Sequence, residues 1–116
     1  MAAWKKSITE LAKCPNVNMK LGGLGMTSFG FGFEFEDAPP SSEKLAETWR
    51  PYIETCIEAF GPNRCMFESN FPPDKQSCGY TELWNAFKHL TKNASADEKR
   101  ALYSGTAARV YKLQAP

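Results

Sequence analysis

The chain has 116 residues, with 14 basic and 13 acidic side chains and a formal charge of +1. This length allows at most one domain with one modest hydrophobic core. The balanced charge, without a basic block, gives little support to a partner made of nucleic acid or to a membrane surface. The longest apolar runs are a few residues, far below the roughly 20 that span a bilayer. The N-terminal sequence MAAWKKSITELAK mixes charges into an amphipathic pattern, unlike a signal peptide.

The first third of the chain predicts one helix, one strand and a long loop. Apolar residues recur at helical spacing over 3–13, and Cys14-Pro15 ends that helix. Polar and apolar residues then alternate over Asn16–Leu21, as in a strand. Residues 22–40 are rich in Gly, Phe and Pro and predict a mobile loop that closes over something apolar. A phosphate-binding loop is disfavoured because no helix starts directly after the glycines.

The remaining residues predict a second strand between further helices. A helical pattern runs from Ser41 to Phe60, and Pro51 inside it predicts a kink or a restart. Cys65, Met66 and Phe67 form a short buried strand. A third helix covers 80–90, and Ser95 with Glu98 forms a capping box for a fourth, which Gly105 is expected to break. Strands that alternate with helices indicate α/β architecture with parallel β/α units, but two strands alone are too few to close a barrel.

The second strand runs directly into polar residues, in the sequence RCMFESNFPPDK from 64 to 75. In parallel β/α folds, ligands bind at the carboxyl ends of the strands. Neighbouring parallel strands lie about 4.8 Å apart, so residues that leave the same ends share one pocket. We therefore expect Asn70 to face the same cavity as Lys20 or the Gly22-Gly23 backbone, with Asp74 and Lys75 just above it.

Three stretches carry a resemblance to a known family: W…LA.CPNV.MKLGGL, FGPNRCMFESNFP and LWNAFKHLT…ADEKRALYSGTAARVYKL. From about residue 4 to 113, the chain resembles the C-terminal portion of the amidohydrolase-related metal-dependent hydrolases, a TIM-barrel group that contains lactonases and decarboxylases. The resemblance implies that Asn16–Leu21 is strand seven and Arg64–Ser69 strand eight of a TIM-like (β/α)8 barrel. Residues 1–116 would then form a single partial domain, with 22–40 as a loop within it. Such barrels have about 250 residues, so roughly the first two-thirds would be absent.

The resemblance also suggests site residues. In many members, strand eight ends in a Ser-Asp-aromatic-Pro motif whose Asp binds a metal or acts as general base. Here Ser69-Asn70-Phe71-Pro72 places Asn70 at that position, and an uncharged amide neither accepts a proton near neutral pH nor binds a divalent cation well. Asn70 is the catalytic candidate, and Lys20, Asp74 and Lys75 are substrate-binding candidates. The alternatives are a turn cap at Asn70, a solvated Asp74–Lys75 loop pair and a surface position for Lys20.

Other catalytic chemistry has little support in the sequence. The single histidine, His89, lies off the apolar face of its helix and is expected to be exposed, and no Ser–His or Cys–His pair is evident. No metal site is predicted in this chain, although the family implies a divalent metal in full-length relatives. Four cysteines stand far apart without a CxxC pair, which favours reduced thiols in a cytoplasmic protein over an extracellular two-disulfide domain.

We therefore expect part of a hydrolase that acts on lactones or similar carbonyl compounds, inactive as the isolated chain. The alternative is a non-catalytic truncated module that folds by self-association, because apolar helix faces and two lone strands leave surfaces that one copy cannot cover. The predicted partners are a small-molecule substrate, if the protein is complete, and further copies of the chain.

Overall fold

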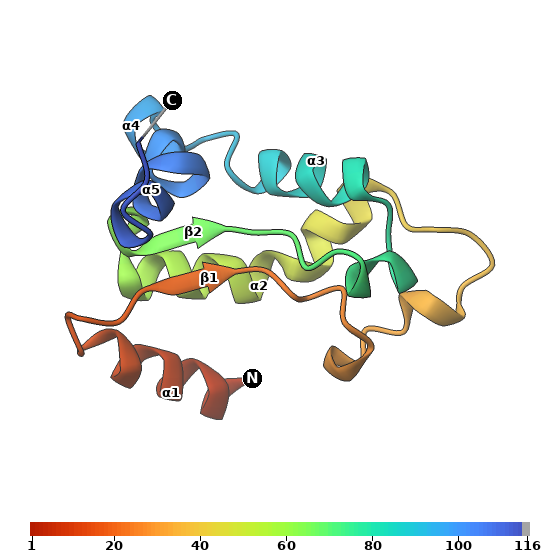
Figure 1. The fold of residues 1–116 in the computed structure, drawn as a ribbon. Coiled ribbons are helices and arrows are strands. Elements are labelled where there is room, and N and C mark those ends of the chain that lie inside the picture. Colours follow the sequence, from red (N-terminus) through yellow and green to blue (C-terminus); the bar gives the residue numbers. More distant parts are fainter. Residues whose placement is uncertain (115–116) are drawn as a thin grey trace. The chain divides into compact units, whose positions relative to one another are not determined.

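The computed structural model describes residues 1–114 (Figure 1). The contacts within the chain form two compact units. The first, called here the strand unit, comprises Met1–Leu21, Pro51–Phe67 and the residues from Ala94 onward. The second, called the loop unit, comprises Gly22–Arg50 and Glu68–Asn93. Both strands thus belong to the first unit, and the segments that directly follow them belong to the second.

The strand unit is built on two parallel strands, β1 (Met19–Leu21) and β2 (Cys65–Phe67). Met19 pairs with Cys65 and Leu21 with Phe67, and the two arrows run in the same direction in Figure 1. The predicted parallel pairing is confirmed. β1 is shorter than the predicted 16–21, because the Val17 N–H bonds back to the Cys14 carbonyl in a turn.

Helix α1 (Ala2–Ala12) and the part of α2 (Ser42–Phe60) from Pro51 onward also belong to this unit. α1 contacts α2 through the rings of Trp4 and Tyr52, whose centroids are 5.3 Å apart. The predicted restart at Pro51 does not occur, since α2 continues through it as one helix. Proline lacks the N–H that would bond one turn back, and the boundary between the two units falls directly before it. Thr55 Oγ1 donates to the Pro51 carbonyl at 2.6 Å.

Arg64, directly before β2, connects the ends of both helices. Its guanidinium donates to the carbonyls of Ala12 (2.8 Å), Cys14 (3.0 Å), Val17 (3.2 Å) and Phe60 (3.2 Å). The cation also lies 5.1 Å from the centroid of the Phe60 ring. Carbonyls at the C-terminal end of a helix have no partner within the helix. One side chain therefore supplies donors to the ends of α1 and α2 and to the turn before β1.

The C-terminal segment of the strand unit is helical throughout most of its length. α4 (Ala96–Arg100) begins with the predicted capping box, in which the Glu98 N–H donates to Ser95 Oγ and Glu98 Oε1 accepts from the Ser95 N–H. A π-helical turn (Ala101–Gly105) follows and leads directly into α5 (Thr106–Val110). Gly105 therefore does not end the helix as expected, but closes a widened turn. Thr106 Oγ1 anchors α5 by donating to the Pro62 carbonyl at 2.8 Å.

The loop unit contains α3 (Tyr80–Leu90), with the bounds that the sequence predicts. The buried ring of Phe87 lies 6.1 Å from Trp49 of α2 and 5.3 Å from Trp84. Between residues 22 and 40, where we expected a mobile loop, short 3-10 turns form at Thr27–Phe29 and Phe33–Phe35. Glycines at positive φ border these turns, Gly30 at 74° and Gly32 at 79°. Within residues 1–114, no helix combines the length and apolar character needed to cross a bilayer.

Candidate functional site

The segment that follows β2 forms a compact hydrogen-bonded turn in the loop unit. A 3-10 turn covers Pro73–Gln76, and the Phe71-Pro72 peptide before it is cis. The Asn70 N–H donates to Asp74 Oδ2 at 2.9 Å, and the Asp74 N–H donates to the Asn70 carbonyl, also at 2.9 Å. Both main-chain polar groups of Asn70 are thus bound to Asp74. The carboxamide of Asn70, on a half-buried residue, lies outside this pair of bonds.

Asp74 is fully buried, with 0% of its surface exposed. Among the described residues, no hydrogen bond reaches its Oδ1. Burial raises the pKa of the Asp74 carboxyl above its usual range, the bond from the Asn70 N–H acts in the opposite direction, and the nearby charge of Glu68 raises it further. The alternative reading of Asp74 as one half of a solvated loop pair is therefore wrong, because this carboxyl is shielded from water.

The glycine-rich segment that follows β1 packs closely against this hydrogen-bonded turn. A Cβ placed on Gly25 would lie 2.9 Å from Asp74 Oδ1, and one on Gly22 would collide with the Glu68 side chain. Ser77 Oγ donates to the Gly25 carbonyl at 2.5 Å. The close approaches of Asp74 and Glu68 to these two positions require glycine. The segments after the two strands are consequently in contact with each other inside the loop unit.

The candidate residues are distributed over both units. Asn70 and Asp74 are bound to each other in the loop unit, and Lys75 is exposed on the same 3-10 turn. Lys20 belongs to the strand unit, where it is exposed on β1 opposite Met66. A cavity shared by Asn70 and Lys20 stays a prediction.

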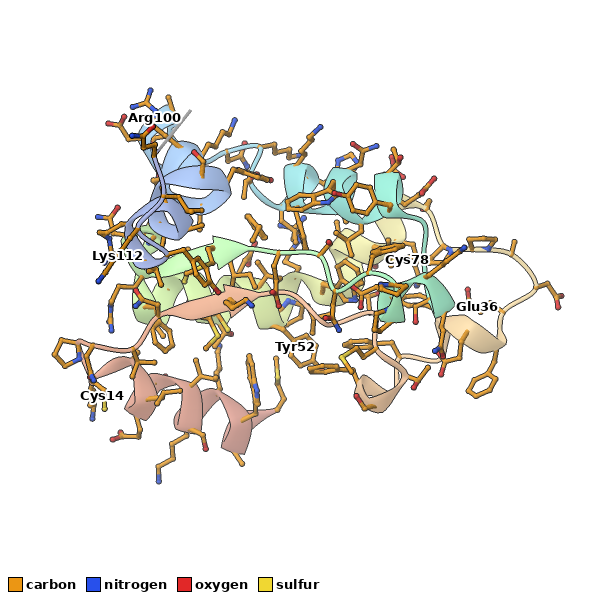
Figure 2. All side chains as sticks on the ribbon, viewed as in Figure 1. Cys14, Glu36, Tyr52, Cys78, Arg100 and Lys112 are labelled. Atoms are coloured by element: carbon orange, nitrogen blue, oxygen red, sulfur yellow. The ribbon has the colours of Figure 1, made fainter. Side chains whose placement is uncertain are left out.

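Lys75 lies on the wall of a groove of about 270 Å³ in the loop unit. Glu36 and Cys78, both labelled in Figure 2, belong to its lining. The lining residues come from two segments of the chain: Phe33, Glu34 and residues 36–39, and residues 75–79. The lining of this groove therefore combines Lys75 with three acidic residues, Glu34, Glu36 and Asp37.

A Ser–His contact is present that the sequence analysis did not foresee. Ser42 Oγ lies 3.2 Å from His89 Nε2, and Glu43 Oε1 lies 3.5 Å from the same nitrogen. A catalytic triad needs the carboxylate at the other ring nitrogen, where it orients the imidazole. This cluster does not have that arrangement. Ser42 and His89 are 47 positions apart in the sequence, and no motif there reveals the contact.

The larger groove of the strand unit, of about 480 Å³, presents arginines that already have partners. Arg100, labelled in Figure 2, pairs with Asp97 at 3.5 Å. Arg109 donates to the Asn63 carbonyl and to Asn18 Oδ1. These bonds connect α5 to the residue before β1 and to the turn before β2, which is a structural role.

The donor set of the described residues does not fit a metal ion. Within residues 1–114, no group of three or more His, Cys, Asp or Glu side chains is placed to hold one. The thiols are buried apart from Cys14: burial raises the pKa of Cys56 to about 11, that of Cys65 to about 12 and that of Cys78 to about 11. Thiolate ligands or nucleophiles are accordingly disfavoured at these three positions.

Parallel β/α units with polar residues directly after the strands are typical of α/β folds, in which ligands bind at the carboxyl ends of the strands. The comparison with known proteins identifies the group. The amidohydrolase family model matches residues 1–113, so this chain belongs to the amidohydrolase family. Its fold is a segment of a TIM-like barrel that corresponds to the C-terminal part, as predicted.

Several relatives share this region. An L-fucono-1,5-lactonase of Burkholderia multivorans is 34% identical over 121 residues, which cover 100% of this chain and 37% of the relative. An uncharacterized protein of Sinorhizobium fredii, y4mH, is 40% identical over 95% of this chain and 33% of its own length. A crystal structure of a Burkholderia multivorans amidohydrolase with bound HEPES superposes with a TM-score of 0.78 at 30% identity, covering 97% of this chain and 37% of that one. The chain thus spans about a third of the length of these relatives.

Proposed function

We propose that this chain supplies the strand-eight side of an active site that hydrolyses lactones or similar carbonyl compounds. The observation that carries the proposal is the position of Asn70, three residues after the end of β2 and bound at both main-chain groups by Asp74. The similarity to an L-fucono-1,5-lactonase supports a lactone as substrate class.

Asn70 would act through its carboxamide. The Nδ2 group can donate a hydrogen bond to the lactone carbonyl and to the negative charge that develops on its oxygen during attack. It cannot remove a proton from water, so the general base has to come from another residue. Lys75, on the 3-10 turn that follows Asn70 in the loop unit, would bind a polar group of the substrate.

The isolated chain is proposed to lack turnover. Asp74, whose carboxyl is bonded to the Asn70 N–H, is fully buried, and its Oδ2 already accepts that hydrogen bond. His89 lacks a carboxylate at its second nitrogen among the described residues. A general base and an activated water would therefore have to be supplied by parts of a complete barrel.

Binding and turnover test the proposal separately. Ligand-observed NMR with L-fucono-1,5-lactone compares the wild type with Asn70→Ala and with a matched control, Asn93→Ala, at an exposed asparagine. We expect binding by the wild type and the control, binding at least about tenfold weaker in Asn70→Ala, and hydrolysis no faster than in buffer. Equal binding by Asn70→Ala contradicts the site. Turnover that Asn70→Ala abolishes contradicts the proposed inactivity.

A non-catalytic module is the second candidate, and the sheet favours it. Within residues 1–114 the sheet has two strands, so each strand has one edge without a neighbouring strand. Leu11 and Leu113 of the strand unit are also exposed. Open edges and apolar surface promote association, so this reading predicts homo-oligomers. Sedimentation at micromolar concentration tests it, and a monodisperse monomer would contradict it.

A further inference from the structure

The carboxyl group of Asp74 is buried without making contact with solvent, although a carboxylate in an apolar setting is unfavourable unless it has partners. Oδ2 accepts from the Asn70 N–H, and Oδ1 faces Gly25 at a distance that leaves no room for a Cβ. The main chain of Asp74 is equally engaged, because its carbonyl accepts from the N–H groups of Ser77 and Cys78. Every part of this residue is directed into the protein.

Such a side chain cannot reach a substrate, yet it holds the residue that is placed to do so. The two bonds between Asp74 and Asn70 close a ring that fixes the peptide groups on both sides of the Asn70 Cα. With these groups fixed, the carboxamide has only its own side-chain torsions left to vary. A preorganised donor interacts more strongly with developing charge than a mobile one.

We propose that Asp74 is a positioning residue, which clamps the main chain of Asn70 and thereby fixes where its carboxamide is presented. The clamp itself stands on the geometry of the loop unit. Its consequence for a substrate rests on the proposed function, in which Asn70 contacts the lactone. Two further residues complete the clamp. Gly25, in the segment that follows β1, lies against the carboxyl, and Ser77, at the end of the turn, donates a hydrogen bond to the Gly25 carbonyl.

Other ionisable groups face this carboxyl within the loop unit. Glu68 is the carboxylate whose charge acts on Asp74, and the Cys78 thiol lies next to the Asp74 carbonyl. Burial, and then the charges of Asp74 and Glu82, raise the pKa of Cys78 to about 11. The thiol is therefore neutral in the pH range where carboxyls titrate. Lys75 is the neighbouring residue on the turn. A pH-dependent measurement on Asp74 therefore has to separate the effect of its carboxyl from the effect of Glu68.

The first experiment follows the Asn70 amide in the 15N-labelled chain as pH is varied. The Asn70 N–H resonance is expected to move downfield as the Asp74 carboxyl ionises, because the bond becomes charge-assisted, and its midpoint should equal that of the Asp74 13Cγ signal. The movement should persist in Glu68→Gln and vanish in Asp74→Asn, whose amide oxygen can still accept the bond. A wild-type Asn70 resonance that does not share the Asp74 midpoint overturns the proposal, even if Asp74→Asn fails to fold.

The second experiment measures amide exchange and lactone binding in Asp74→Ala and Asp74→Asn. Asn70 N–H exchange should accelerate about tenfold or more in Asp74→Ala and be largely restored in Asp74→Asn. Lactone binding should weaken in Asp74→Ala as it does in Asn70→Ala. Unchanged binding in Asp74→Ala together with weakened binding in Asn70→Ala overturns the positioning role. Unchanged binding in both Asp74→Ala and Asn70→Ala contradicts the proposed function instead, while the amide measurements still decide the clamp.

Discussion

Replacing Arg64 by alanine should destabilise the strand unit more than any surface substitution. The guanidinium donates to four carbonyls, at 2.8 to 3.2 Å, and lies over the Phe60 ring. A hydrogen bond that involves a charged group contributes about 1.5–3 kcal/mol. The four bonds share one half-exposed side chain and are not additive, so we expect a loss of about 3 kcal/mol in the free energy of unfolding.

Two variants separate the geometry of the guanidinium from its charge. Arg64→Lys keeps the charge but has one nitrogen in place of three, and should lose about half as much as Arg64→Ala. Arg100→Ala is the matched control, because that side chain is 74% exposed and pairs with Asp97 at 3.5 Å. An exposed pair of this kind contributes less than about 1 kcal/mol.

Urea unfolding followed by circular dichroism measures these differences, and hydrogen exchange locates them. Amides of α1 should lose protection in Arg64→Ala, whereas those of α3, in the loop unit, should keep it. The reasoning is refuted if Arg64→Ala unfolds within about 1 kcal/mol of the wild type, or if Arg64→Lys is as stable as the wild type.

Three further predictions concern the thiols, the buried carboxyl and the capping box. In the native chain one thiol, the exposed Cys14, should react with a disulfide reagent at pH 8, and all four after unfolding; early reaction of a second thiol contradicts this. Because the pKa of Asp74 is raised in the folded state, its favourable contribution is present below the unfolded pKa of about 3.9 and is lost as pH rises through the folded value. Unfolding titrations should thus show Asp74→Asn gaining stability relative to the wild type as pH rises from acid to neutral, and a gap that does not change with pH refutes it. Ser95→Ala should lower the melting temperature through a loss of about 1 kcal/mol, whereas a melting curve equal to that of the wild type would show that the capping box does not contribute.

Local patterns in the sequence determined most of the secondary structure. The period of apolar residues identified α3 to the residue, the short apolar run identified β2, and the Ser95–Glu98 spacing identified the start of α4. These features depend on residues within one or two turns of each other, so a single sequence contains their cause. The alternation of helices and strands likewise indicated parallel β/α units, and the quoted motifs identified the family.

Only the tertiary structure decided what the polar residues do. The placement of Asp74 beneath Gly25, the contact between Ser42 and His89, and the bonds of Arg64 to main-chain carbonyls join segments 47 to 52 residues apart in most cases. The acceptors for Arg64 are carbonyls, which every residue carries, so no side-chain pattern marks them. Asp74 reads as an ordinary loop residue because its burial is produced by a glycine segment that follows the other strand. The reason is physical: burial and hydrogen-bond partners are properties of the packed chain, and a local sequence does not contain them.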